Sequence, residues 1–207
     1  SFSSIDDQDL FLEKINPKNK QEYLTFNGYN KFQTEEKLIR VKEHPTRKII
    51  LRKTENGIVL PSNTFDIIKI KPIDHEVSLS WTGFNENDST IASLLNLMTS
   101  ESIPDLKNKI LENNTFNLNI ILADKKTIDM IFIGQAPIRP AKSESKGRVI
   151  SLGWKNTNKW QEKSAEINKE LQLNSFKGVI VNTNNRFFYG DFPNHLSFDW
   201  GETQRMM

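Results

Sequence analysis

The chain has 207 residues, which is enough for one large domain or two small ones with a sizeable core. Its 28 Lys and Arg residues against 26 Asp and Glu residues give a formal net charge of +2, and the charges are scattered, which does not favour nucleic acid as a partner. Because there is no cysteine, disulfide bonds and thiolate chemistry are excluded, and any reaction must use hydroxyl, amine, carboxylate or imidazole groups.

No apolar run approaches the roughly 20 residues that a membrane-spanning helix needs, so we expect no membrane span. The N-terminus lacks the basic region followed by an apolar region that is typical of a signal peptide. The first residue is Ser1 rather than Met, so we interpret the sequence as processed or excerpted, and a signal peptide could lie upstream.

Short alternating runs in the first 75 residues predict a strand-rich subdomain. Asp9–Ile15 alternates between apolar and polar residues, and Tyr23–Phe26 is followed by Asn27-Gly28, a strong hairpin turn signal. Further strands are predicted at Lys37–Val41, Lys48–Arg52 and, after the turn Glu55-Asn56-Gly57, at Ile58–Leu60.

The pattern changes after a further strand at Val77–Trp81. Asp88 or Ser89 can cap a helix with one apolar face, which we expect to pack in the core, formed by Ile91, Leu94, Leu95 and Met98. A second helix is predicted to begin near Pro104 and to carry Leu106, Ile110 and Leu111.

A second hairpin is predicted from Phe116–Leu122 and Ile128–Ile133, joined by the polar residues 124–127. The polar stretch Ala141–Arg148 predicts a mobile surface loop. Trp160–Leu173 has a helical composition, and Lys177–Asn182 is predicted to be a strand.

Two short polar clusters could carry chemistry. Asp6-Asp7-Gln8-Asp9 offers oxygen ligands that suit Ca²⁺, although helix caps and solvated turns use the same residues. The run 182–185 (NTNN) follows a predicted strand, and a fixed amide there could stabilise a developing oxyanion, although it could also be an ordinary turn. The histidines have no spacing typical of a catalytic or metal site; they are His44, His75 and His195.

Three stretches, in this order, resemble motifs of the penicillin acylase family of N-terminal-nucleophile (Ntn) amide hydrolases. The first is Asp6–Lys14 (DDQDLFLEK), and the second is the hairpin Asn117–Arg139. The third begins with Lys177–Asn185 and continues through Asp191-Phe192-Pro193, Trp200 and Arg205.

The resemblance implies an α+β fold that is part of an αββα four-layer Ntn-hydrolase core with a β-rich knob subdomain. Residues 1–9 would form a core strand and a calcium segment, and residues 10–76 would form the knob. Residues 77–207 would supply helices, a hairpin and the strand of the oxyanion hole.

The resemblance also implies a division of catalytic roles. Family members expose a serine at the N-terminus of the β chain, and its α-amine serves as the base. When the chain is registered on Asp6 and Asp9, Ser1 falls several dozen residues after that serine. We therefore expect an internal part of the β chain without the nucleophile, and the weaker alternative is that Ser1 is a processed nucleophile.

Three residues match family positions at the reaction centre. The backbone N–H of Phe2 and the side-chain amide of Asn184 would form the oxyanion hole. Arg205 would orient the nucleophile and the oxyanion asparagine, although a surface ion pair is an alternative role for this arginine.

The resemblance implies a structural Ca²⁺ ion and no organic cofactor. Asp6 and Asp9 match side-chain ligands, and Gln8 matches a backbone-carbonyl ligand. Two other family ligands have no counterpart, because Asn194-His195-Leu196 stands where the family has an aspartate, and residues 141–148 contain no proline.

The sequence therefore predicts a piece of an amide hydrolase that acts on a small N-acyl compound, such as a β-lactam side chain or an acyl-homoserine lactone. Its partners would be the α chain and the N-terminal β segment of the same precursor, in a periplasmic or secreted enzyme. The alternatives are a catalytically inactive remnant and a stand-alone β-rich binding module.

Overall fold

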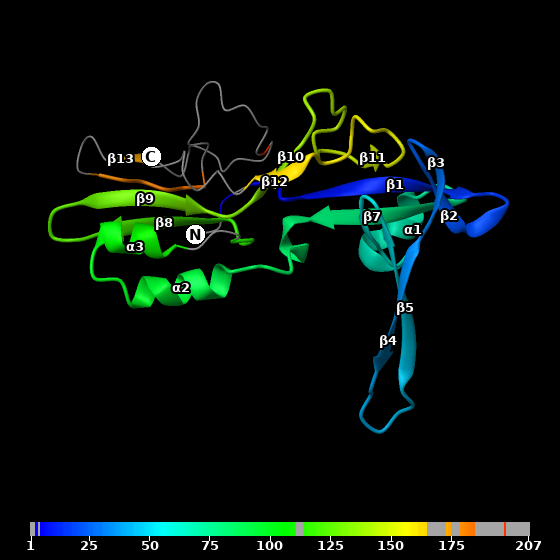
Figure 1. Ribbon diagram of the computed structural model, residues 1–207, viewed down its shortest axis with the longest axis horizontal. Coiled ribbons are helices and arrows are strands. Elements are labelled where there is room, and N and C mark those ends of the chain that lie inside the picture. The colour runs from blue at the N-terminus through cyan, green and yellow to red at the C-terminus, as the bar shows by residue number, and fades with distance from the viewer. Residues whose placement is uncertain are drawn as a thin grey trace. The chain divides into compact units, whose positions relative to one another are not determined.

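The structure is a computed structural model that describes residues 3, 5–110, 114–164, 173–174, 179–184 and 197 (Figure 1). Its contacts divide the chain into two compact units. We call Gln8–Trp81 with Arg139–Trp160 the β unit, and Ser1–Asp7 with Thr82–Ile138 and Gln161–Met207 the mixed unit. Within the described part of the chain, no helix is long and apolar enough to cross a membrane.

The β unit is built on an eight-stranded sheet with the order β3-β2-β1-β7-β6-β5-β4, and β11 pairs with β1 in parallel. Neighbouring strands in this order are antiparallel. The strands predicted in this part of the chain and the Asn27-Gly28 turn are confirmed. The strands are β1 (Gln8–Asn16), β2 (Asn19–Thr25), β3 (Gly28–Lys31), β4 (Gln33–Ile39), β5 (Arg47–Thr54), β6 (Gly57–Val59), β7 (His75–Trp81) and β11 (Ser151–Leu152). A short helix, α1 (Ile67–Ile70), precedes β7.

Strand β1 buries every second side chain, so that Asp9, Phe11, Glu13 and Ile15 share the inner face of the sheet. Phe11 is 1% exposed, and Ile15 belongs to an apolar cluster with Tyr23, Phe32 and Val59. Burial raises the pKa of Tyr23, whose hydroxyl accepts the backbone N–H of Glu55 at 2.9 Å. The alternation read from the sequence therefore defines the core, but it also places two carboxylates inside it.

Glu13 is fully buried, and hydroxyl and amide donors surround one of its oxygens. Oε1 accepts hydrogen bonds from Ser78 Oγ at 2.6 Å, from Thr54 Oγ1 at 2.8 Å and from Asn56 Nδ2 at 3.1 Å. A buried carboxylate is tolerated only when such donors replace water. Glu13 thereby fixes β1 against β5, β7 and the turn between β5 and β6.

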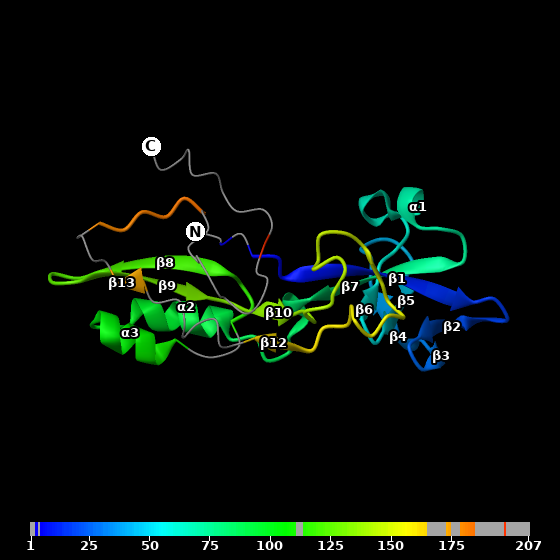
Figure 2. The same ribbon diagram turned by 90° about the horizontal axis from the view of Figure 1, so that it is seen from above.

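The mixed unit packs helices against a hairpin (Figures 1 and 2). β8 (Leu118–Ala123) and β9 (Ile128–Ile133) form the predicted hairpin, and β13 (Leu173–Asn174) extends it. Leu106 of α3 (Ile103–Lys109) packs against Ile131 and Ile133 of β9, with Leu97 of α2 (Thr90–Met98) beside them. A separate pair is formed by β10 (Ala136–Ile138) and β12 (Glu162–Ser164).

The predicted helix starts are found, although the caps differ in detail. Asp88 accepts the backbone N–H of Thr90 at 3.1 Å and that of Thr115 at 3.1 Å, so it joins the start of α2 to the approach to β8. Ser102 caps α3 by accepting the Asp105 N–H at 3.2 Å, and Pro104 lies in its first turn.

Part of the predicted core stripe of α2 is wrong. Ile91, Leu95 and Met98 are 62%, 59% and 82% exposed. The side of this helix that faces inward instead carries the small residues Thr90 and Ser93. Periodicity gave an apolar face, but the contacts of a nine-residue helix decide which side is covered.

The predicted helix at Trp160–Leu173 is also wrong in the described residues. Glu162–Ser164 pairs with β10 and Leu173–Asn174 pairs with β9, because backbone pairing to a neighbouring strand overrides weak helix propensity. Of the strand predicted at Lys177–Asn182, residues 179–182 are described and are not in a strand, and the rest lies outside the described residues.

The two units also differ from the predicted division into 1–9, 10–76 and 77–207. The β unit extends from residue 8 to residue 81, and it includes residues 139–160, which were assigned to the core portion. The physical reason is that Arg139 and Trp160 donate hydrogen bonds to Asp9 of β1, and that β11 pairs with β1.

Glu76 gives the β unit an acid-sensitive contact. Burial alone would raise the pKa of Glu76, but hydrogen bonds from Lys71 at 2.5 Å and Arg52 at 2.7 Å outweigh burial and lower this pKa. A carboxylate with a lowered folded-state pKa contributes stability that is present above its unfolded pKa, about 4.3, and is lost as pH falls through the folded value.

We predict that Glu76→Gln lowers the free energy of unfolding at pH 7 by about 1 kcal/mol and makes stability less dependent on pH between roughly pH 5 and pH 3. Urea unfolding at a series of pH values measures both effects. Glu36→Gln is the control, because the Glu36–Lys48 pair is exposed and is expected to contribute little. An unchanged acid dependence in Glu76→Gln would contradict the prediction.

Candidate functional site

The asparagine-rich turn lies in the mixed unit. The side-chain oxygen of Asn182 accepts the backbone N–H of Asn184 at 2.9 Å, which closes a local turn. Asn184 has a φ of 60°, in the left-handed region that asparagine tolerates better than most residues. The sequence Asn-Thr-Asn therefore holds the backbone of Asn184 in a defined conformation.

The same turn lies beside β8. Asn119 Nδ2 donates to Asn182 Oδ1 at 3.5 Å, and two residues earlier the carbonyl of Asn117 accepts the backbone N–H of Ser3 at 2.9 Å. The N-terminal segment and the Asn182–Asn184 turn thus both contact the beginning of β8.

The two faces of β8 have different chemistry. Leu118, Ile120 and Leu122 pack against the apolar cluster of Leu106, Ile131 and Ile133. Because successive side chains of a strand point to opposite faces, Asn117 and Asn119 lie on the other face, where they are 7% and 6% exposed. Asn117 Nδ2 also donates to Asp7 Oδ2 at 3.2 Å.

This amide-lined face is a functional candidate that the sequence reading did not single out. The signal was available in the string NLNIIL, where the amides alternate with apolar residues. The segment was interpreted only as a hairpin strand, because alternation alone does not tell whether a polar face meets water or another segment.

Of the residues predicted to form the reaction centre, Asn184 is described. Phe2 and Arg205 lie outside the described residues, as does Ser1. Ser3, directly after Phe2, is described and is hydrogen-bonded to β8.

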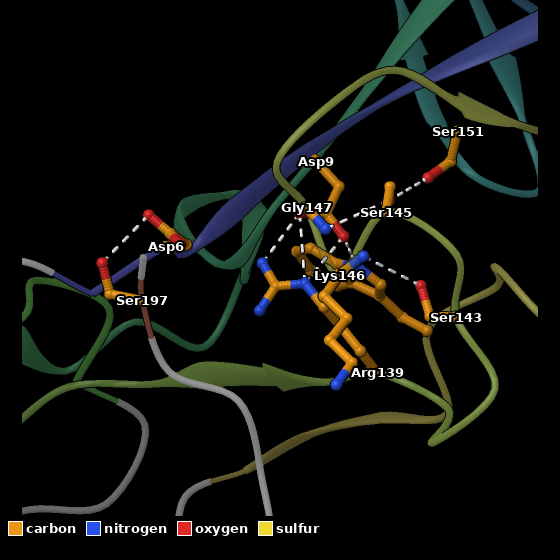
Figure 3. A network of polar contacts seen from close by, with 10 residues as sticks. Asp6, Asp9, Arg139, Ser143, Ser145, Lys146, Gly147, Ser151 and Ser197 are labelled. Atoms are coloured by element: carbon orange, nitrogen blue, oxygen red, sulfur yellow. Dashed lines mark hydrogen bonds and ion pairs between the residues drawn. The ribbon is translucent and has the colours of Figure 1, made fainter. Parts of the chain in front are cut away.

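A second polar constellation lies in the β unit, around Asp9 (Figure 3). Asp9 is 4% exposed and the side chain of Arg139 is 3% exposed. Arg139 Nη2 donates to Asp9 Oδ1 at 2.7 Å, and Arg139 Nε donates to Oδ2 at 3.0 Å. Trp160 Nε1 donates to Oδ2 at 2.6 Å. Both oxygens of this carboxylate therefore accept hydrogen bonds, and one cation compensates its charge.

The loop after Arg139 encloses this pair (Figure 3). Gly147 N–H donates to Ser145 Oγ at 3.1 Å, Lys146 N–H donates to Ser143 Oγ at 3.2 Å, and the hydroxyls of Ser145 and Ser151 are 2.5 Å apart. Ser143 and Ser145 are buried. Most of the predicted surface loop Ala141–Arg148 is exposed, and its buried polar residues also supply hydrogen bonds inside the loop.

The predicted calcium ligands are divided between the two units. Asp6 belongs to the mixed unit, where Ser197 Oγ donates to its Oδ1 at 3.4 Å, whereas Gln8 and Asp9 belong to the β unit. Calcium needs six to eight oxygen ligands, and both oxygens of Asp9 are already engaged by N–H donors. Asp9 does not fit a metal ligand, and within the described ranges there is no cluster of three or more His, Cys, Asp or Glu suited to a metal.

Comparison with known proteins relates the whole chain to one family. The family model described as "Penicillin amidase" matches residues 1–207. The fold is similar to that of a thermostable penicillin G acylase from Alcaligenes faecalis, with a TM-score of 0.64 and 19% sequence identity over 79% of this chain. The chain spans 28% of the length of that acylase chain.

Gly147 provides a test of the enclosed pair. Its φ is +88°, and an added Cβ would overlap Asp9 Oδ1 and lie 2.8 Å from Arg139 Nη2. We predict that Gly147→Ala lowers the free energy of unfolding by about 3 kcal/mol, because left-handed strain adds to overpacking.

The control is Gly28→Ala, which has a φ of +110° but open space around the new Cβ. It should cost only about 1 to 2 kcal/mol of backbone strain. Denaturant unfolding of both variants measures the difference, and equal losses would show that the loop does not close on the Asp9–Arg139 pair.

Proposed function

Because the chain belongs to the penicillin amidase family, we propose that it is part of an amide hydrolase and supplies oxyanion stabilisation rather than the nucleophile. The serine hydroxyl and the α-amine that acts as its base would come from another part of the same precursor. The substrate would be a small N-acyl amide, such as a β-lactam side chain or an acyl-homoserine lactone.

In this proposal, charge stabilisation falls to three residues of the chain. When the serine attacks the amide carbonyl, negative charge develops on the carbonyl oxygen. The side-chain amide of Asn184 and the backbone N–H of Phe2 would donate to that oxygen, and Arg205 would orient Asn184 and the nucleophile. Donors fixed before the reaction need no reorganisation in the transition state, which makes them effective.

The observation that carries the proposal is the hydrogen bond from Asn184 N–H to Asn182 Oδ1 at 2.9 Å. It holds Asn184 in a left-handed conformation next to β8, as expected for a residue that must present its amide in one direction. Ser3, the neighbour of Phe2, is bonded to Asn117, two residues from the Asn119 side chain that contacts Asn182. Two segments carrying the proposed donors thus contact the same part of β8.

We further propose that the mixed unit forms part of a four-layer αββα core. The β8–β9–β13 sheet with α2 and α3 would provide one sheet layer and one helical layer. The α chain and the N-terminal β segment of the precursor would supply the remaining layers and most of the acyl pocket. The 28% coverage of the acylase chain is consistent with such partners.

The test is reconstitution of the 207-residue chain with the separately produced remainder of its own precursor. We predict no turnover of an N-acyl amide by the chain alone and release of the free amine after reconstitution. Asn184→Ala should lower kcat by about 100-fold to 1,000-fold with a smaller effect on KM, because its amide acts mainly in the transition state.

Asn87→Ala, at an exposed turn residue, is the matched control and should keep full activity. A correctly assembled complex without turnover would favour an inactive remnant. Full activity of Asn184→Ala would remove the proposed oxyanion role, and an adduct at Ser1 with a serine-directed acyl inhibitor would make Ser1 the nucleophile.

A further inference from the structure

The Asp9 carboxylate is almost fully buried. It is 4% exposed and lies on the inner face of β1, two residues from Phe11. An ionised carboxylate at such a position needs a cation and hydrogen-bond donors, because the cost of removing it from water is several kcal/mol.

Arg139 provides that cation from a segment 130 residues away in the sequence. Its Nη2 and Nε approach the two carboxylate oxygens at 2.7 Å and 3.0 Å, the two-pronged geometry that suits a planar guanidinium. Trp160 donates to Oδ2 from the opposite end of residues 139–160, so both ends of this segment are attached to one side chain of β1.

Because of these contacts, neither carboxylate oxygen of Asp9 is readily available to coordinate a divalent metal. A metal would have to displace hydrogen bonds from both oxygens and would lie next to a buried positive guanidinium, where repulsion is weakly screened. The backbone at Gly147 closes another side of the pair, since even a methyl group there would overlap Asp9 Oδ1.

We propose that Arg139 acts as an internal cation that takes the place of a bound metal at Asp9. Its guanidinium fastens residues 139–160 to β1, and the β unit keeps this attachment without calcium. The family resemblance assigned Asp9 to a calcium site, and the contacts of this chain assign the carboxylate to Arg139 and Trp160 instead.

The metal test uses the full 207-residue chain with Ca²⁺ and with Tb³⁺ as probes. Tb³⁺ bound at Asp9 would be excited through Trp160, whose Nε1 lies 2.6 Å from Oδ2. We expect no saturable terbium luminescence that depends on Trp160, and a Tm that shifts by less than about 1 °C between excess chelator and millimolar calcium.

Trp154→Phe is the control for other tryptophan-sensitised sites. Luminescence that is lost in Trp160→Phe but kept in Trp154→Phe, or a saturable calcium-dependent rise in Tm that Asp9→Asn abolishes, would overturn the proposal. The expected absence of luminescence and of a Tm shift is measured on the unmodified chain.

A double-mutant cycle tests the attachment itself. Asp9→Asn and Arg139→Met should each raise the unfolding equilibrium constant by about 100-fold or more, because each leaves a buried partner uncompensated. In the double variant, the unfolding equilibrium constant should rise by much less than the product of the two single increases.

The exposed pair Lys20–Asp74 is the matched control, with side chains that are 62% and 54% exposed. Lys20→Met and Asp74→Asn should couple by about threefold or less. Coupling at Asp9–Arg139 that is no larger than this would overturn the proposal. If Arg139→Met fails to fold, the metal measurements on the unmodified chain decide.

Discussion

The β unit depends on two carboxylates that β1 carries into its core. Because β1 buries alternate positions, Asp9 and Glu13 lie on the same inner face as Phe11 and Ile15. Neither acid can be buried alone, so each must find donors. The donors to Glu13 come from β5, β7 and the turn between β5 and β6, whereas the donors to Asp9 come from both ends of residues 139–160. This requirement explains why residues 139–160 fold with residues 8–81.

The mixed unit differs from the β unit, because apolar side chains lie on one side of β8 and the amides of Asn117 and Asn119 lie at its start on the other side. The apolar side of β8 packs with Leu106 of α3, whereas on the other side Asn117 donates to the Asp7 carboxylate and Asn119 donates to the side chain of Asn182. Amide side chains can hold neighbouring segments by hydrogen bonds without adding a charge of their own. Such a surface is suited to fixing neutral donors, which is the role proposed for Asn184.

The two units suggest how a penicillin amidase family chain can contribute to catalysis without the nucleophile. The mixed unit would orient donors toward a developing oxyanion, and the β unit would provide a scaffold fastened by an internal ion pair. An arginine held by the chain is always present, whereas a bound metal depends on its concentration. Activity would then depend on assembly with the rest of the precursor more than on metal supply.

The sequence by itself determined the local elements and the family. Alternation gave β1, β-type runs gave β8 and β9, Asn27-Gly28 gave the first turn, and Pro104 gave the start of α3, because these signals act between near neighbours. Only the tertiary structure decided that Ile91, Leu95 and Met98 are exposed, that residues 162–164 pair as a strand, and that Asp9 belongs to Arg139. The local composition near Asp9 was compatible with a metal site or a helix cap. In the structure, the carboxylate instead binds the guanidinium of Arg139, which lies 130 residues away in the sequence. Local patterns specify which side chains a strand buries. The partner of a buried charge can be distant in sequence, so it is determined only by the tertiary structure.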